Sequence, residues 1–150
     1  MTDLLQPEPG ARPWLPAGDV TALATLNEYN IPLAGLIEQG GTTYLYACLF
    51  GELEDVNIWA YARVNKAEIE RLNSLTGDAL ADAIRASLEN RMLLVAIAFD
   101  HELADWLRID AGVEGPLGLA RRFVAQMRAH LANMQRGIDE LASQRELASA

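Results

Sequence analysis

The densest group of side chains that could carry chemistry is the segment Asp100-His101-Glu102-Leu-Ala-Asp105. Three carboxylates and an imidazole this close together are donors that bind divalent cations. Adjacent residues point in different directions in a helix or a strand, so they would converge on one ion only in a specialised loop. A helix cap at Asp100 with Glu102 in the first turn is the favoured alternative. Asp100, His101, Glu102 and Asp105 are therefore carried as a candidate metal site, and a metal-dependent hydrolase as the least favoured function.

Two arginines at the start of the last predicted helix form a candidate anion site. The loop Gly115-Pro-Leu-Gly118 leads to Arg121 and Arg122. Backbone N–H groups at a helix N-terminus and guanidinium groups both bind phosphate or carboxylate. The loop lacks the Lys and the Ser/Thr of a phosphate-binding motif. Arginines that are solvated, or paired with Glu114 or Asp110, are the favoured alternative.

Aromatic residues fall on neighbouring predicted strands, at Tyr44, Tyr46, Trp59 and Tyr61. On one face of a sheet they would form a stacking surface for a base or another flat ligand. Covering by helices is favoured over ligand binding, because large aromatic residues mostly serve cores. The ligand hypothesis places a small anionic or nucleotide-like molecule between Trp59 and Tyr61 on the sheet and Arg121 and Arg122 on the helix.

No set of residues predicts catalysis or a cofactor. Cys48 lies in the middle of a predicted strand, and the two histidines, His101 and His130, cannot be placed in a nucleophilic triad without inventing geometry. An enzyme is therefore the less favoured class. With a single cysteine, no internal disulfide is expected.

The length and composition of the chain limit the classes of protein to which it can belong. The chain of 150 residues is long enough for one domain with a hydrophobic core. Its net charge of −9 disfavours non-specific binding to nucleic acid. No apolar run reaches the ~20 residues of a membrane span, and the N-terminus does not resemble a secretion signal. We expect a cytoplasmic protein that is not embedded in a membrane.

The hydrophobic pattern predicts an α+β domain. We expect an antiparallel meander of four to five strands, with helices on one face. The predicted strands cover residues 31–38, 42–50, 56–64 and 92–99, and the predicted helices cover residues 19–26, 65–72 and 78–89. Residues 101–109 are ambiguous, and a helical turn is favoured over a second hairpin strand. The domain, residues 19–116, follows a Pro/Gly-rich arm, residues 1–18, which is either flexible or laid extended on the domain; Trp14 would tether it.

Three segments of the sequence are similar to segments of a known group of domains. They are Tyr29-Asn30-Ile31-Pro32-Leu33, the strand TYLYACLF, and Asn65-Lys66-Ala67-Glu68-Ile69, which begins as a capped helix. The stretch of roughly residues 28–100 resembles a group of uncharacterised small bacterial α+β domains, in which a Tyr-Asp-Gly-Pro-Leu-like start precedes a short meander and a helix. Asn-Ile stands here in place of Asp-Gly. The resemblance supports the fold and brings no functional residue with it.

The C-terminal segment, residues 117–150, predicts a long helix with a heptad repeat. Apolar residues alternate at steps of four and three: Ala120, Val124, Met127, Leu131, Met134, Ile138 and Leu141. We call this series the heptad seam; a period of 3.5 is typical of coiled coils. A helix over residues 118–149 would be roughly 48 Å long, whereas a globule of this size is roughly 38 Å across. If this helix is straight, part of the seam must meet another copy, a partner protein or the N-terminal arm. The alternative is a helix that breaks near Gly137 and packs entirely on its own sheet.

These features favour a non-enzymatic interaction or accessory protein that acts as a homodimer, with Val124, Met127, Leu131, Met134, Ile138 and Leu141 at the interface. Another protein partner of the same helix stays open. The alternative is a small-ligand binding or sequestering protein of a bacterium or phage. The helix is also unusually basic at its start: Arg121, Arg122 and Arg128 lie in a stretch without acidic residues, on an otherwise acidic chain.

Overall fold

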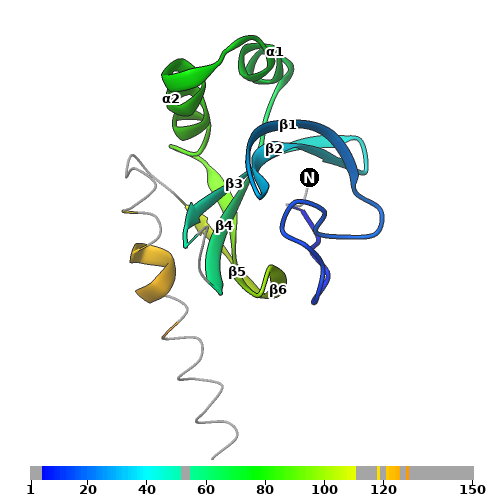
Figure 1. Ribbon diagram of the computed structural model, residues 1–150, viewed down its shortest axis with the longest axis vertical. Coiled ribbons are helices and arrows are strands. Elements are labelled where there is room, and N and C mark those ends of the chain that lie inside the picture. Colours follow the sequence, from blue (N-terminus) through cyan, green and yellow to red (C-terminus); the bar gives the residue numbers. More distant parts are fainter. Residues whose placement is uncertain (1–4, 52–54, 111–117, 119–120, 126–127, 129–150) are drawn as a thin grey trace, which may run out of the picture.

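A six-stranded sheet forms the centre of the computed structural model, which describes residues 5–51, 55–110, 118, 121–125 and 128. The strands lie in chain order, and each pairs antiparallel with the next (Figure 1). The elements in order are β1 (Thr21–Tyr29), β2 (Ile31–Gln39), β3 (Thr42–Phe50), β4 (Val56–Arg63), α1 (Lys66–Ser74), α2 (Gly77–Ser87), β5 (Met92–Phe99) and β6 (Glu102–Asp110). The α+β class is confirmed, with six strands in place of the expected four to five.

The central strands and the two helices lie close to where the sequence pattern puts them. The segment TTYLYACLF is β3, and its middle residues are buried because both faces of the sheet are covered. The helix start at Asn65 is a capping box: the backbone N–H of Glu68 donates to Asn65 Oδ1 at 2.8 Å, and the N–H of Asn65 donates to Glu68 Oε1 at 3.2 Å. Arg91, just before β5, pairs with the Glu68 carboxylate at 2.8 Å. Glu68 therefore joins α1 to the next strand.

The predicted helix over residues 19–26 is wrong, because Thr21–Tyr29 form the edge strand β1. Most of its side chains are exposed, so neither a helical nor a strand periodicity stands out in its sequence. Its backbone groups pair with β2, through a turn at Asn30 with a φ of 65°. The tertiary pairing decides the conformation where local propensity is weak.

The favoured helical turn over residues 101–109 is also wrong, since this segment is β6. Asp100 and His101 both have positive φ, 53° and 61°, which is the geometry of a two-residue hairpin turn. Ala104 lies at a register shift, because Ile97 pairs with Asp105 while Ala98 pairs with Leu103. The extra residue breaks the alternation of the strand and leaves its apolar residues at a helix-like spacing.

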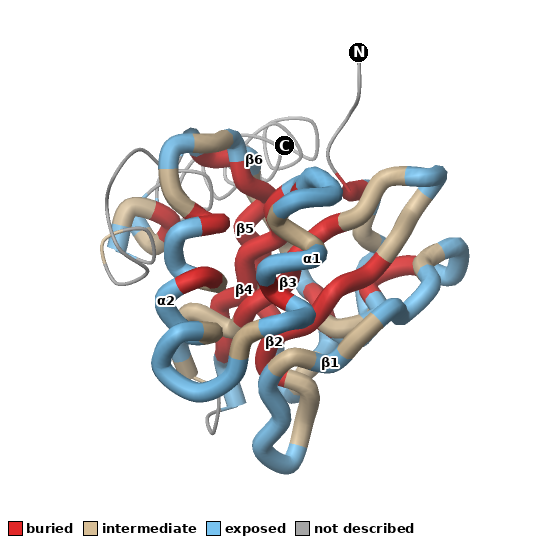
Figure 2. The backbone as a smooth tube through the Cα atoms, turned by 90° about the horizontal axis from the view of Figure 1, so that it is seen from above, coloured by how far each residue is buried: buried red, intermediate tan, exposed pale blue. Residues whose placement is uncertain are grey.

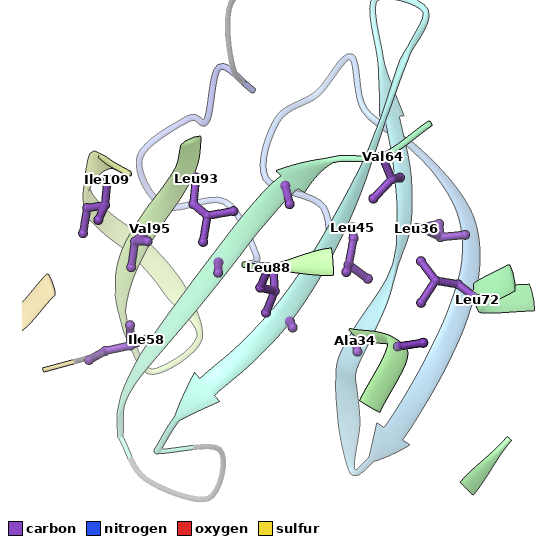
Figure 3. Close-up of a cluster of buried hydrophobic side chains, with 14 of the residues drawn as sticks. Ala34, Leu36, Leu45, Ile58, Val64, Leu72, Leu88, Leu93, Val95 and Ile109 are labelled. Carbon is purple, nitrogen blue, oxygen red and sulfur yellow. The ribbon is translucent and has the colours of Figure 1, made fainter. Parts of the chain in front are cut away.

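Each face of the sheet carries its own hydrophobic core, and alternate residues of β4 divide between them: Ile58 and Ala60 on one, Trp59 and Tyr61 on the other. The helix-side core lies under α1 and α2, where Leu72 and Leu88 pack on the sheet (Figure 3). The arm-side core holds the aromatic residues, and residues 5–18 lie against it with Leu5 and Ala17 buried. Burial is concentrated in β2, β3, β4 and β5 between the two cores (Figure 2).

Candidate interaction surface

The aromatic residues of the ligand hypothesis lie on one face of the sheet, as predicted, but the arm covers them instead of helices. Trp59 and Tyr61 are both 0% exposed. The Tyr61 hydroxyl donates to the Pro13 carbonyl at 2.6 Å, and the Trp14 ring lies 6.1 Å from the Trp59 ring. Burial raises the pKa of Tyr61 well above its ordinary value, with a smaller contribution from Tyr46. Trp59 and Tyr61 are therefore core residues and offer no surface for stacking.

The arginines of the same hypothesis lie on the opposite side of the sheet from the aromatic residues. Phe123 is 0% exposed and belongs to the helix-side core, so the helical residues 121–125 dock on that face. Arg121 is exposed, and the Arg122 guanidinium donates to the Asp110 carbonyl at the end of β6. The sheet separates both arginines from Trp59 and Tyr61, so the predicted composite pocket is not formed.

The acidic segment forms a hairpin turn and the start of β6, and its side chains disperse. The His101 ring lies 6.0 Å from that of Trp14, and its Nε2 is buried without a hydrogen-bond partner among the described residues. Asp105 Oδ1 accepts from the N–H of Trp106 at 2.8 Å, while Asp100 and Glu102 are exposed. Within the described ranges, no three His, Cys, Asp or Glu side chains gather as they would around a metal ion. The four residues are not brought together as a metal site.

The structure reveals a feature that the sequence analysis missed, an exposed apolar patch where three strands end. We call it the strand-end patch: Phe50, Val56 and Phe99, with exposed fractions of 57%, 42% and 49%. Val56 pairs with Phe99, and Phe50 pairs with Ile58 of the helix-side core. Paired residues share a face, which places the patch on the helix-side face beyond the cover of α1 and α2. Bulky aromatics directly before polar turns, Phe50 before Gly51 and Phe99 before Asp100, were the available signal.

Acidic side chains border the strand-end patch. Glu102 pairs with Phe99 across the β5–β6 ladder, and Asp55 and Asp100 are joined by a backbone hydrogen bond of 2.7 Å beside the Val56–Phe99 pair. All three acids are exposed. In the part of the chain that the structure describes, none of the three carboxylates has an ion-pair partner. The patch therefore combines a hydrophobic centre with three exposed carboxylates at its border, where the Arg12 guanidinium also donates to the Asp100 and His101 carbonyls at 3.2 Å each. Two of the acids come from the segment that the sequence offered as a candidate metal site.

A buried polar side chain fixes the shape of this end of the sheet. Asn57 is 0% exposed, and its Nδ2 donates to the Gly51 carbonyl at 2.9 Å while its Oδ1 accepts from Trp59 Nε1 at 3.3 Å. Gly51 has a φ of +76°, and an added Cβ would clash with the Val56 carbonyl oxygen. Phe50 and Val56 are thus held by a satisfied buried network, so the exposed patch rests on a rigid support.

The helical residues 121–125 lie on the same face of the sheet as the patch, because Phe123 belongs to the helix-side core. Of the predicted interface residues, Val124 is partly buried against the helix-side core. Met127, Leu131, Met134, Ile138 and Leu141 lie outside the described residues. The group that anchors the helix to its own sheet is Phe123, which is not part of the heptad seam.

No protein-family model matches the chain. No curated protein and no solved structure matches it either. Within the described residues, no helix is long and apolar enough to cross a membrane.

Proposed function

We propose that this protein is a non-enzymatic interaction or accessory protein that acts as a homodimer through its C-terminal helix. The proposal rests mainly on how residues 121–125 are buried. Phe123, which lies beside the heptad seam, is fully buried against the domain, whereas the seam residue Val124 is only partly buried. Residues 121–125 are therefore attached to the domain mainly through Phe123, at an edge of the seam.

The sequence supports a short attachment. Positions that follow Phe123 at heptad intervals have the same orientation on a coiled-coil helix. They are His130 and Gly137, which offer no large apolar side chain for the sheet. The seam itself continues through Met127 to Leu141 without a charged residue among its members. A continuous apolar stripe of this kind is uncommon on a monomer's surface and is satisfied by a second helix.

Charge supports a partner with the composition of this same chain. Arg121 and Arg128 are exposed near the start of the helix, and no ion pair to them is formed from the described residues. The rest of the chain is acidic, with a net charge of −9 overall. A second copy offers both an apolar seam and acidic surface for these arginines. A different protein with an acidic, apolar face would meet the same requirements and would co-purify in a pull-down.

Cytoplasmic location belongs to the same proposal. Cys48 is the single cysteine of the chain, so it cannot form an internal disulfide, and its Sγ lies 3.6 Å from the Phe50 carbonyl oxygen. A reducing compartment suits such a thiol. Binding of an anionic or nucleotide-like ligand, the alternative function, retains only Arg121 and Arg122, since the arm covers the aromatics. No contact in the described part of the chain favours it over assembly.

The test compares two substitutions on the helix. Leu131→Glu places a charge in the heptad seam, whereas Ala125→Glu places the same charge at an exposed position outside it. We expect Leu131→Glu to weaken dimerisation at least tenfold, which corresponds to about 1.4 kcal/mol. Ala125→Glu should leave it within about twofold. Light scattering across a concentration series measures both. Equal behaviour of the two variants would contradict a role for the seam.

A further inference from the structure

We infer that the strand-end patch of Phe50, Val56 and Phe99 receives the C-terminal helix of a second copy, so that the two chains of the dimer contact each other reciprocally. This inference rests on the proposed function and specifies its interface. The occupant is the basic, apolar segment around residues 121–141 of the partner copy.

The apolar match is the first reason. Phe50 and Phe99 are roughly half exposed on the helix-side face, where the helix of the same chain is already attached by Phe123. The interface would thus continue from the buried helix-side core onto the patch. A helix carrying Leu, Met and Ile at heptad spacing presents side chains of the kind that cover aromatic rings in a core.

Charge complementarity is the second reason, and it identifies the segment of the second copy that docks on the patch. Asp55, Asp100 and Glu102 border the patch and are exposed. From Gly118 to Gln135 the chain contains arginines and no acid, which makes this segment the matching positive element of the sequence. Opposite charges at the border of an apolar contact set its orientation and its specificity. A second copy brings this segment to the patch, and two-fold symmetry makes the contact twice.

The size of the patch shows that it works together with the seam. Two half-exposed phenylalanines and one valine offer roughly 250 Å² of apolar surface, taking 150–250 Å² for a whole aromatic side chain. A stable interface buries about 800 Å² on each partner. The patch alone is therefore too small to hold a dimer, so the remaining area has to come from the helix surface.

A photo-crosslinking experiment on the full chain tests the inference. p-Benzoyl-phenylalanine replaces Phe99, and unlabelled and ¹⁵N-labelled copies are mixed before illumination. The matched control places the same group at Met92, which is also 49% exposed but lies at the opposite end of β5. We expect peptides of mixed isotope composition that join position 99 to residues 121–141, and none of these from position 92. Products within a single copy, products joining the patch to another segment, or no product would each overturn the inference.

Three substitutions, one of them a control, measure the same contact independently. Phe99→Glu should weaken the dimer at least tenfold, whereas Met92→Glu should leave it within about twofold. Glu102→Lys, which changes only an exposed side chain, should weaken it roughly two- to fivefold at low salt and less at high salt, as expected for a bordering charge. A wild-type monomer would contradict the proposed function itself. A wild-type dimer unaffected by Phe99→Glu and Glu102→Lys would contradict only the patch as its docking site.

Discussion

The two faces of the sheet are closed in different ways. On the arm-side face, residues 5–18 of the same chain cover the aromatic residues, and backbone hydrogen bonds join Gly10 and Ala11 to Leu103 at 2.8 Å each. On the helix-side face, α1, α2 and Phe123 cover the centre and leave Phe50, Val56 and Phe99 exposed. The helix-side face also carries large aromatic residues, with Phe123 buried and Phe50 and Phe99 exposed. The size of the side chains therefore does not tell which face the chain closes by itself, and the segment that covers each face decides it.

The largest expected effect is the difference in stability loss between removing an aromatic side chain from one face of the sheet and removing one from the other. Trp59→Ala removes a side chain that is 0% exposed and should lower the free energy of unfolding by about 3–5 kcal/mol. Phe99→Ala removes a side chain that is half exposed in the single chain and should cost about 1 kcal/mol or less under conditions where the protein is monomeric. Urea unfolding at low protein concentration measures both. Similar losses would show that the strand-end patch is not exposed.

A smaller effect tests the hydrogen bond that holds the arm, residues 5–18, against the sheet. Tyr61→Phe keeps the ring and removes the hydroxyl that donates to the Pro13 carbonyl. Leaving this carbonyl unpaired in a buried site should cost about 1–3 kcal/mol. Limited proteolysis should then cleave residues 5–18 faster, while the sheet stays protected. Tyr44→Phe, on the same face, is a comparison for the loss of a hydroxyl. An unchanged cleavage rate for Tyr61→Phe would show that this bond does not hold the arm.

The smallest effect concerns Glu68 on the helix-side face. Burial raises the pKa of Glu68, but hydrogen bonds from Arg91 and Asn65 and the charge of Arg91 outweigh it, and the net pKa lies below the ordinary value of 4.5. A depressed carboxyl pKa adds stability above the unfolded-state pKa, which is lost as the pH falls through the folded-state pKa. Glu68→Gln should therefore cost at most about 1 kcal/mol at pH 7. That difference from wild type should shrink as the pH falls below 4.5 in thermal unfolding. A difference that stays constant as the pH falls would exclude the ion pair as its cause.

The sequence predicts the centre of this fold well, because β3, β4 and β5 carry strong patterns. Continuous apolar residues in β3 and strict alternation in β4 reflect burial on two faces, and the capping box at Asn65 is a local signal that needs no tertiary information. The edge strands are different. No residue of β1 is buried, and the extra residue at Ala104 gives β6 a helix-like spacing. Their conformation is decided by pairing with a neighbour, which a local pattern does not contain.

The candidate functional residues also divide into those that a local pattern predicts and those that only tertiary structure brings together. The sequence places Tyr44, Tyr46, Trp59 and Tyr61 on one face, because alternation sets the face. It does not show that the arm would close that face, or that Arg121 would lie across the sheet from Trp59. The strand-end patch escapes a sequence search for a similar reason: Phe50, Val56 and Phe99 are far apart along the chain and meet only through the register of three strands.

Self-association of the full chain, which both proposals require, is measured directly by sedimentation equilibrium. Over a concentration series into the tens of micromolar, we expect a mass that approaches twice the 16.4 kDa of a single chain. The transition should shift to higher concentration for Leu131→Glu and for Phe99→Glu. A mass of 16.4 kDa at every concentration would contradict the central claim, and with it the proposed role of both the seam and the patch.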